Sequence, residues 1–171
     1  MSLNSTVNLC ALDLSKAFDR MNHYGLFIKL MVKRIPQNLL ELLENWFRCG
    51  STCVKWGAHI SEFFALNAGI RQGGVLSPYL FALYIDSVVD KVRSTNVGCT
   101  VNGACLSILL YADDIILLAP TVMALQQLVM ACEDELSWLD MHINVNKTFC
   151  IRIGPKYRVD PAKIVTRSGM E

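Results

Sequence analysis

Two adjacent aspartates, Asp113 and Asp114, interrupt a strongly apolar stretch at residues 106–120. The leucine- and isoleucine-rich segments on either side predict a hairpin whose strands are buried in a sheet. A buried, unpaired carboxylate costs several kcal/mol, while the net stability of a whole domain is only about 5–15 kcal/mol. The pair therefore forms either a solvent-exposed turn or a site for a divalent cation, which prefers carboxylate oxygens.

A further carboxylate, Asp13, directly follows the apolar run at residues 7–12, which predicts a buried strand. If that strand pairs with the hairpin, Asp13 meets Asp113 and Asp114, although it lies one hundred positions before Asp113. Three converging carboxylates suit two-metal phosphoryl transfer, in which two divalent ions lie about 3.5–4 Å apart. Neighbouring side chains of a strand point in opposite directions, so we expect the hairpin aspartate nearer Asp13 to matter more.

Helices and strands alternate along the remaining chain. Helical spacing and capping signals predict long helices at residues 23–35, 37–48, about 78–92 and 121–140, with Ser77 and Thr121 as N-caps of the last two. Strands are expected around residues 52–56, 60–66, 97–101, 104–112, 115–119 and 149–153, with Asn102 and Gly103 as a hairpin turn. This order predicts an α+β fold, an antiparallel sheet with helices packed on one face.

Composition restricts the class of protein. With 171 residues, 53% hydrophobic and 18% charged, the chain is expected to form one globular domain. A net charge of +1 argues against a generally basic nucleic-acid binder. Seven cysteines without a CxxC spacing predict reduced, mostly buried thiols in an intracellular protein, in nucleus or cytoplasm. No signal peptide is recognised and no apolar run reaches the roughly 18 residues of a membrane span, so no membrane partner is expected.

Three motifs carry a resemblance to a known family: LDLSKAFDR at residues 12–20, GIRQGGVLSPYLFALYID at 69–86, and LLYADDIILLA at 109–119. In order and interval they resemble successive palm motifs of reverse transcriptases, and their spelling is most similar to the non-LTR (LINE-type) retrotransposon enzymes. The resemblance covers about residues 7–153. It implies the palm of an RNA-directed DNA polymerase, a nucleotidyltransferase that joins dNTPs to the 3′-OH of a DNA primer on an RNA template, within a retrotransposon polyprotein.

The resemblance also implies a set of metal ligands. Asp13 and Asp113 match the principal ligands, Asp114 their companion, and the carbonyl of Leu14 an additional ligand. Two Mg²⁺ ions are implied as cofactors, and Mn²⁺ can substitute for them. Lys147 resembles the lysine that protonates the departing pyrophosphate; without the motif it is an ordinary solvated lysine.

Further positions match contacts with nucleotide, template and primer. Phe18 corresponds to the aromatic gate that excludes a ribose 2′-OH, although without the motif an ordinary core aromatic is the favoured interpretation. The loop that lies against the incoming nucleotide corresponds to Gln72, Gly73 and Gly74, where glycine lets the backbone approach a ligand closely. Arg71 is implied near the template and Tyr111 near the primer end.

In this family the fingers precede the first motif and the thumb follows the last strand, while only about a dozen residues precede Asp13 here. We therefore expect a single palm domain over residues 1–171, with fingers and thumb of the parent polypeptide largely missing and an irregular tail at 154–171. The activity of such a fragment alone stays open. One alternative is a non-catalytic palm-like module that binds RNA or protein. Another is an intron-encoded or viral RNA-dependent polymerase, and Phe18 argues against an RNA-synthesising enzyme.

Overall fold

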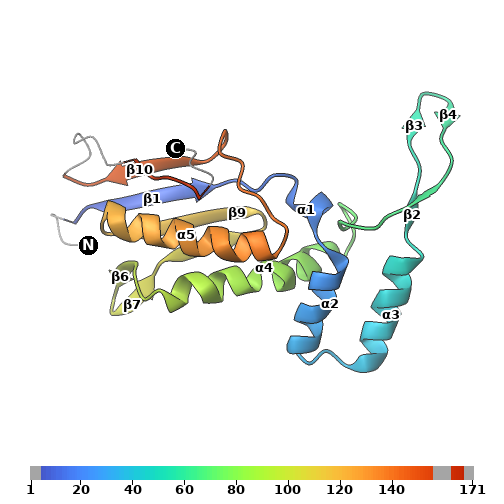
Figure 1. Cartoon of the computed structure of the whole chain (residues 1–171), viewed down its shortest axis with the longest axis horizontal. Coiled ribbons are helices and arrows are strands. Elements are labelled where there is room, and N and C mark those ends of the chain that lie inside the picture. The colour runs from blue at the N-terminus through green and yellow to red at the C-terminus, as the bar shows by residue number, and fades with distance from the viewer. Residues whose placement is uncertain (1–4, 156–162, 168–171) are drawn as a thin grey trace. The chain divides into compact units, whose positions relative to one another are not determined.

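The computed structural model describes residues 5–155 and 163–167, and the chain divides into two compact units. The unit called here the sheet unit comprises Met1–Ala17 and Ile85–Glu171, and the helical unit comprises Phe18–Tyr84. Figure 1 labels the helices and strands of both units. That residues 1–171 form a single domain remains a prediction.

A four-stranded antiparallel sheet with the order β10-β1-β9-β8 forms the centre of the sheet unit. β1 (Val7–Leu12) lies between β9 (Asp114–Ala119) and β10 (Phe149–Ile153), while β8 (Ile108–Tyr111) forms an edge. Along β1, buried and partly exposed residues alternate because successive side chains of a strand point to opposite faces. The predicted first and last strands and the predicted hairpin with its aspartate pair are confirmed.

One face of this sheet is covered by helix α5 (Val122–Trp138), which packs against β1 and β9 (Figure 1). Its N-cap is Thr121, whose Oγ1 accepts a hydrogen bond from the Ala124 amide at 3.1 Å, as predicted. The helix ends two residues earlier than the predicted residue 140. Its buried residues repeat at helical spacing: Leu125, Leu128, Val129, Ala131, Cys132 and Leu136. The α+β pattern with a helix on one sheet face is thereby confirmed.

A second, two-stranded sheet consists of β6 (Cys99–Val101) and β7 (Ala104–Leu106). The predicted turn between them is confirmed, since Asn102 and Gly103 both have positive φ angles, 51° and 82°. Strand β7 does not continue into β8: β7 pairs with β6, β8 pairs with β9, and Ser107 between them belongs to neither strand. The predicted long strand over residues 104–112 is therefore two short strands.

Helix α4 (Ser77–Ser94) begins in the helical unit and ends in the sheet unit. The predicted helix is confirmed, but the predicted N-cap role of Ser77 is wrong. The buried Ser77 hydroxyl donates to the carbonyl oxygen of Arg71 at 2.5 Å. This hydroxyl therefore ties the loop before the helix to the helix start.

In the helical unit, α2 (His23–Val32) and α3 (Gln37–Arg48) pack against each other. The short α1 (Ala17–Arg20) precedes them. The predicted strand pair beyond α3 is present as two short ladders, which are the pairs β2 (Ser51–Thr52) with β5 (Phe64–Ala65) and β3 (Lys55–Trp56) with β4 (His59–Ile60). Gly57, with a φ of 61°, lies in the turn that joins β3 to β4.

The described helices include none that is both long and apolar enough to cross a bilayer. The predicted irregular tail lies partly outside the described residues, at 156–162 and 168–171. Residues 163–167 contain no helix or strand and lie along α5. There, the Val165 amide donates a hydrogen bond to Gln126 Oε1 at 2.9 Å. The Val165 carbonyl oxygen accepts one from Gln126 Nε2 at 2.7 Å.

The expectation that the cysteines are mostly buried is wrong. All seven thiols are free, and their burial divides as follows: Cys10 and Cys132 are buried, Cys53 and Cys99 are partly exposed, and Cys49, Cys105 and Cys150 are exposed. Cys150 is directly opposite Cys10 in the ladder but lies on the outer strand β10. Cysteine burial follows position in the sheet, which composition does not reveal.

Alkylation of the folded chain is expected to spare Cys132 and Cys10 and to modify Cys49 and Cys105. Burial raises the pKa of Cys132 to about 12, and a hydrogen bond with Cys150 together with burial raises the pKa of Cys10. Both groups are then thiols near pH 7.5, and only a thiolate attacks iodoacetamide efficiently. Mass spectrometry of peptides after timed alkylation measures this order, with the unfolded chain, in which all seven react, as the control. Rapid labelling of Cys132 in the folded chain would contradict it.

Candidate active site

The three aspartates lie at the same end of the two central strands. Asp13 directly follows β1, whose last ladder pair is Leu12 with Ile115. Asp114 is the first residue of β9 and pairs with Tyr111, so Asp113 lies in the two-residue turn between the hairpin strands. One further step of the β1–β9 register brings Asp13 opposite Asp114. Asp13 and Asp113 are partly buried, and Asp114 is exposed.

Their oxygen donors fit a divalent cation in chemical kind, since Mg²⁺ is bound through carboxylates and water. The sheet topology also fits, because it brings carboxylates from residues one hundred positions apart to one strand end. Within residues 5–155 and 163–167, however, no three His, Cys, Asp or Glu side chains are gathered closely enough to hold a metal ion. The predicted ligand residues thus lie at one strand end, but among the described residues their side chains do not form a metal-binding cluster.

Asp13 is held by the turn that precedes β10. Its backbone amide donates to Thr148 Oγ1 at 3.3 Å, and its carbonyl oxygen accepts from the Asn144 amide at 2.8 Å. The Asn144 side chain donates to Asp13 Oδ2 at 3.1 Å. Asn144 and Thr148 therefore support the candidate site, and neither was among the predicted site residues. Nothing local in the sequence indicates a partner more than 130 positions away.

The same turn brings Lys147 to Asp13. Lys147 Nζ lies 4.0 Å from Asp13 Oδ2, and the lysine side chain is 69% exposed. An ion pair this long and this exposed adds little stability, so the lysine stays free to change partner. Leu14, the other predicted ligand of this region, is buried and forms an isolated bridge with Ile143.

The remaining predicted residues divide between the two units. Tyr111 belongs to the sheet unit, at the turn of the aspartate hairpin, where its side chain is 83% exposed. The gate and loop residues all belong to the helical unit: Phe18, Arg71, Gln72, Gly73 and Gly74. The structure therefore brings the carboxylates, Lys147 and Tyr111 into one unit and the predicted nucleotide contacts into the other.

In the helical unit, Phe18 stacks on Phe81 with ring centroids 4.5 Å apart and an interplanar angle of 19°. Its carbonyl oxygen accepts from the Ile70 amide at 2.8 Å, which ties the first motif to the glycine-rich loop. The exposed side chain of Gln72 donates to Asp19 Oδ1 at 3.5 Å. Phe18 and Gln72 thus belong to one connected group of residues.

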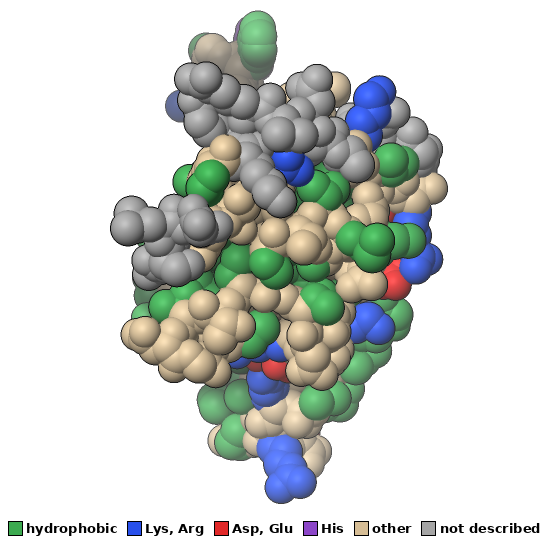
Figure 2. Space-filling view, turned by 90° about the vertical axis from the view of Figure 1, so that its left-hand side faces the viewer, with side chains coloured by type: hydrophobic (Ala, Val, Ile, Leu, Met, Phe, Trp, Pro, Cys, Tyr) green, Lys and Arg blue, Asp and Glu red, His purple; other side chains and the backbone are tan. Residues whose placement is uncertain are grey.

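Charge is distributed unequally between the units. The helical unit contains seven Lys and Arg residues against four Asp and Glu, whereas the sheet unit contains nine against eleven. In the described part of the face in Figure 2, Lys and Arg side chains are scattered between hydrophobic and polar groups. The near-neutral net charge of the chain is therefore the sum of a basic helical unit and an acidic sheet unit.

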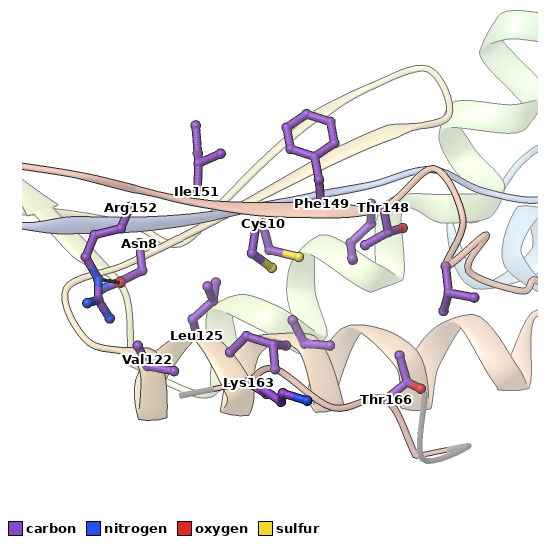
Figure 3. Close-up of a pocket in the computed structure, with 15 residues that line it drawn as sticks. Asn8, Cys10, Val122, Leu125, Thr148, Phe149, Ile151, Arg152, Lys163 and Thr166 are labelled. Atoms are coloured by element: carbon purple, nitrogen blue, oxygen red, sulfur yellow. Dashed lines mark hydrogen bonds between the residues drawn. The ribbon is translucent and has the colours of Figure 1, made fainter. Parts of the chain in front are cut away.

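A cavity of about 290 Å³ lies in the sheet unit between β1, β10 and α5 (Figure 3). Cys10 and Leu125 point into it, while Phe149 and Ile151 point away from α5. At one end, Arg152 Nε donates to Asn8 Oδ1 at 2.9 Å. The three aspartates do not line this cavity, so it is separate from the candidate active site.

Comparison with known proteins assigns the fold and the site to a family. A family model described as "Reverse transcriptase (RNA-dependent DNA polymerase)" matches residues 3–163. The chain belongs to the reverse transcriptase family. Structures of telomerase share the fold of this reverse transcriptase chain: apo telomerase from Candida tropicalis, truncated from its C-terminal domain, matches with a TM-score of 0.66 and 18% identity over 87% of this chain and 31% of that one. Telomerase from Candida albicans in complex with a TWJ fragment of telomeric RNA matches with a TM-score of 0.66 and 13% identity over 96% and 30%. The predicted palm fold is thereby confirmed.

Relatives of this reverse transcriptase chain come from retrotransposons. A retrovirus-related Pol polyprotein from the type-2 retrotransposable element R2DM of Drosophila melanogaster is 33% identical over 142 residues, which are 83% of this chain and 13% of the relative. An RNA-directed DNA polymerase from mobile element jockey of Drosophila funebris is 30% identical over 144 residues, 81% of this chain and 15% of the relative. The predicted likeness to non-LTR retrotransposon enzymes is confirmed, and the chain spans less than a fifth of these relatives.

Proposed function

We propose that this chain is the palm portion of an RNA-directed DNA polymerase that extends a DNA primer on an RNA template. In the proposed reaction the oxygen of the primer 3′-OH forms a bond to the α-phosphorus of a dNTP. The bond from that phosphorus to the pyrophosphate oxygen breaks, and the proton of the 3′-OH is released. Fingers and thumb from the parent polypeptide are the proposed partners of the palm.

The observation that carries this proposal is the shared strand end of Asp13, Asp113 and Asp114. In the proposed site these carboxylates and the carbonyl of Leu14 would hold divalent ions, Mg²⁺ with Mn²⁺ as substitute. Such ions would lower the pKa of the attacking hydroxyl and stabilise the leaving group. The turn at Asn144 and Thr148 supports the assignment, because it fixes the backbone and side chain of Asp13 by hydrogen bonds.

The other residues have roles in binding and proton transfer. Lys147, whose ammonium is exposed beside Asp13, would donate the proton that the departing pyrophosphate takes up. Phe18 and Gln72 would contact the sugar and the incoming nucleotide, and Arg71 and Tyr111 the template and primer end. The excess of basic residues in the helical unit favours contact with a polyanion such as RNA.

Primer extension on an RNA template with dNTPs and Mg²⁺ or Mn²⁺ tests the proposal directly. We expect extension by the wild-type chain and its loss in Asp113→Ala, because the substitution removes a carboxylate from the shared strand end. An Asp113→Ala variant that extends the primer as well as the wild type would contradict the proposed polymerase. A folded wild-type chain that leaves the primer unextended would show that the palm needs its fingers and thumb for activity.

Replacing Phe18 by alanine is expected to lower the preference for dNTPs over rNTPs at least about tenfold, because a bulky ring that blocks a 2′-OH is removed. Competition between dNTP and rNTP in primer extension measures the preference. Phe63→Ala, which removes a ring that is 73% exposed in the same unit, is the matched control. Because Phe18 also stacks on Phe81, thermal unfolding of both variants must accompany the assay. Unchanged discrimination in a folded Phe18→Ala chain would refute the gate.

A second candidate, a palm-like module that binds RNA without catalysis, is favoured by one observation. No three metal-binding side chains are gathered closely enough among the described residues to hold an ion. This candidate expects RNA affinity that is independent of divalent ions and unchanged by Asp13→Ala and Asp113→Ala. Filter binding of a primed RNA template with and without EDTA distinguishes it from the polymerase.

A further inference from the structure

We propose that His23 is a positioning residue, which anchors the loop of residues 69–74 through the carbonyl group of Gly69 and thereby sets Gln72 for the incoming nucleotide. The nucleotide part of this inference rests on the proposed function. The anchor itself rests on contacts inside the helical unit alone.

The contact is short and well held. His23 Nε2 lies 2.7 Å from the Gly69 carbonyl oxygen, and because a carbonyl only accepts, Nε2 carries the proton of this hydrogen bond. The imidazole packs edge-on against Phe47, with ring centroids 4.5 Å apart and an angle of 61°. Asn22 fixes the backbone beside it by accepting from the amides of Tyr24 and Gly25 at 2.9 and 3.2 Å. The ring is thus oriented by the start of α2 and the end of α3.

Gly69, the first residue of the loop, lies against the end of the first motif. Its amide donates to the Met21 carbonyl oxygen at 2.8 Å, and the next amide, Ile70, donates to the Phe18 carbonyl oxygen at 2.8 Å. His23 adds a side-chain hydrogen bond to these two backbone bonds. This third bond holds the carbonyl group of Gly69. Together they fix the direction in which the chain enters the loop.

The far end of the loop is fixed separately. The Arg71 carbonyl oxygen accepts from the Gly74 amide at 3.1 Å and from the Ser77 hydroxyl at 2.5 Å. Gln72 and Gly73 therefore form the exposed tip of the loop, between the hydrogen bonds at Gly69 and those at Arg71. Loss of the bond at Gly69 changes the position of this tip without breaking the bonds at Arg71.

The loop start borders open space on the side of His23. A cavity of about 320 Å³ in the helical unit is lined by His23, Phe47, Gly69, Ile70 and Arg71, among others. On another side the Gly69 backbone lies close to the backbone of Asp19. The histidine therefore adds a side-chain restraint on the side where the cavity leaves the Gly69 carbonyl group without close packing.

Three variants of the chain test the anchor: His23→Ala, which removes the donor, His23→Gln, whose amide can still donate, and His59→Ala. His59 is an exposed histidine of the β3–β4 ladder in the same unit and is the matched control. Amide hydrogen exchange is measured across residues 69–74. We expect faster exchange at Ile70 in His23→Ala, near wild-type exchange in His23→Gln, and no change in His59→Ala. Equal protection of the loop in His23→Ala and the wild type overturns the anchor.

Steady-state primer extension then tests positioning. We expect His23→Ala to raise KM for dNTP about five- to tenfold, as the loss of one hydrogen bond allows, with kcat within about twofold and with rescue by His23→Gln. A general loss of stability would lower the active fraction and hence kcat instead. An unchanged KM, or no rescue by glutamine, overturns the positioning role. Extension that is unaffected by Asp113→Ala contradicts the proposed function and the nucleotide part with it, while hydrogen exchange still decides the anchor.

Discussion

Primer extension is expected to fall at least about hundredfold when Asp13 is replaced by asparagine, because the substitution removes a negative charge and preserves the shape of the side chain. The structure predicts little change in folding. The backbone bond from residue 13 to Thr148 Oγ1 does not involve the carboxylate, and an asparagine carbonyl can still accept from Asn144. Initial extension rates on a primed RNA template measure the loss of activity. Mn²⁺ titration followed by electron paramagnetic resonance measures the loss of metal binding.

The matched control is Asp90→Asn, which neutralises an exposed carboxylate of the same unit, away from the strand end. It should retain wild-type extension and Mn²⁺ binding. An Asp13→Asn chain with activity within about threefold of the wild type would show that this strand end does not bind the catalytic ions.

Replacement of Gly69 by alanine is expected to destabilise the helical unit by about 3 kcal/mol or more. Gly69 has a φ of +79°, and a Cβ there would lie 2.7 Å from the carbonyl oxygen of Asp19 and 3.0 Å from two further backbone atoms of that residue. Backbone strain and a clash with main chain, which cannot rotate away, therefore add together. Urea unfolding followed by tryptophan fluorescence reports on this unit, which contains Trp46 and Trp56.

Gly73 provides an internal control for that experiment. Its φ of +78° is nearly the same, yet a Cβ there would meet nothing within 4 Å. Gly73→Ala should therefore cost only about 1 kcal/mol, the strain without the clash. Equal destabilisation by the two substitutions would show that close approach of the loop to Asp19 does not contribute to stability.

Most of the sheet unit could be predicted because its pattern is local. A short apolar run marked β1, and a turn pair marked the β6–β7 hairpin. Thr121 marked the start of α5 through a hydrogen bond within its own first turn. The two short ladders after α3 were less predictable, because their strand residues are largely exposed and therefore lack a buried face that would set the pattern.

The carboxylates of the candidate site could be predicted from the sequence, whereas the residues that hold Asp13 in place could not. A carboxylate after an apolar run is visible in the sequence, so Asp13 and the hairpin pair could be connected. The hydrogen bonds from Asn144 and to Thr148 join Asp13 to positions 131 and 135 residues away, and no local pattern encodes such partners. Ser77 was misassigned for a related reason: its serine-proline context is typical of a cap, but the Arg71 carbonyl accepts the hydroxyl proton.

The central position of β1 has a consequence for how the chain folds. Val7–Leu12 is made well before its two neighbours in the sheet, Asp114–Ala119 and Phe149–Ile153. During synthesis both edges of this strand wait for partners from the second half of the chain, and pairings this distant in sequence form slowly. Any nascent chain that stops before residue 149 leaves one β1 edge open to other strands. The sheet around the segment that carries Asp13 is therefore completed only after residues 149–153 have left the ribosome.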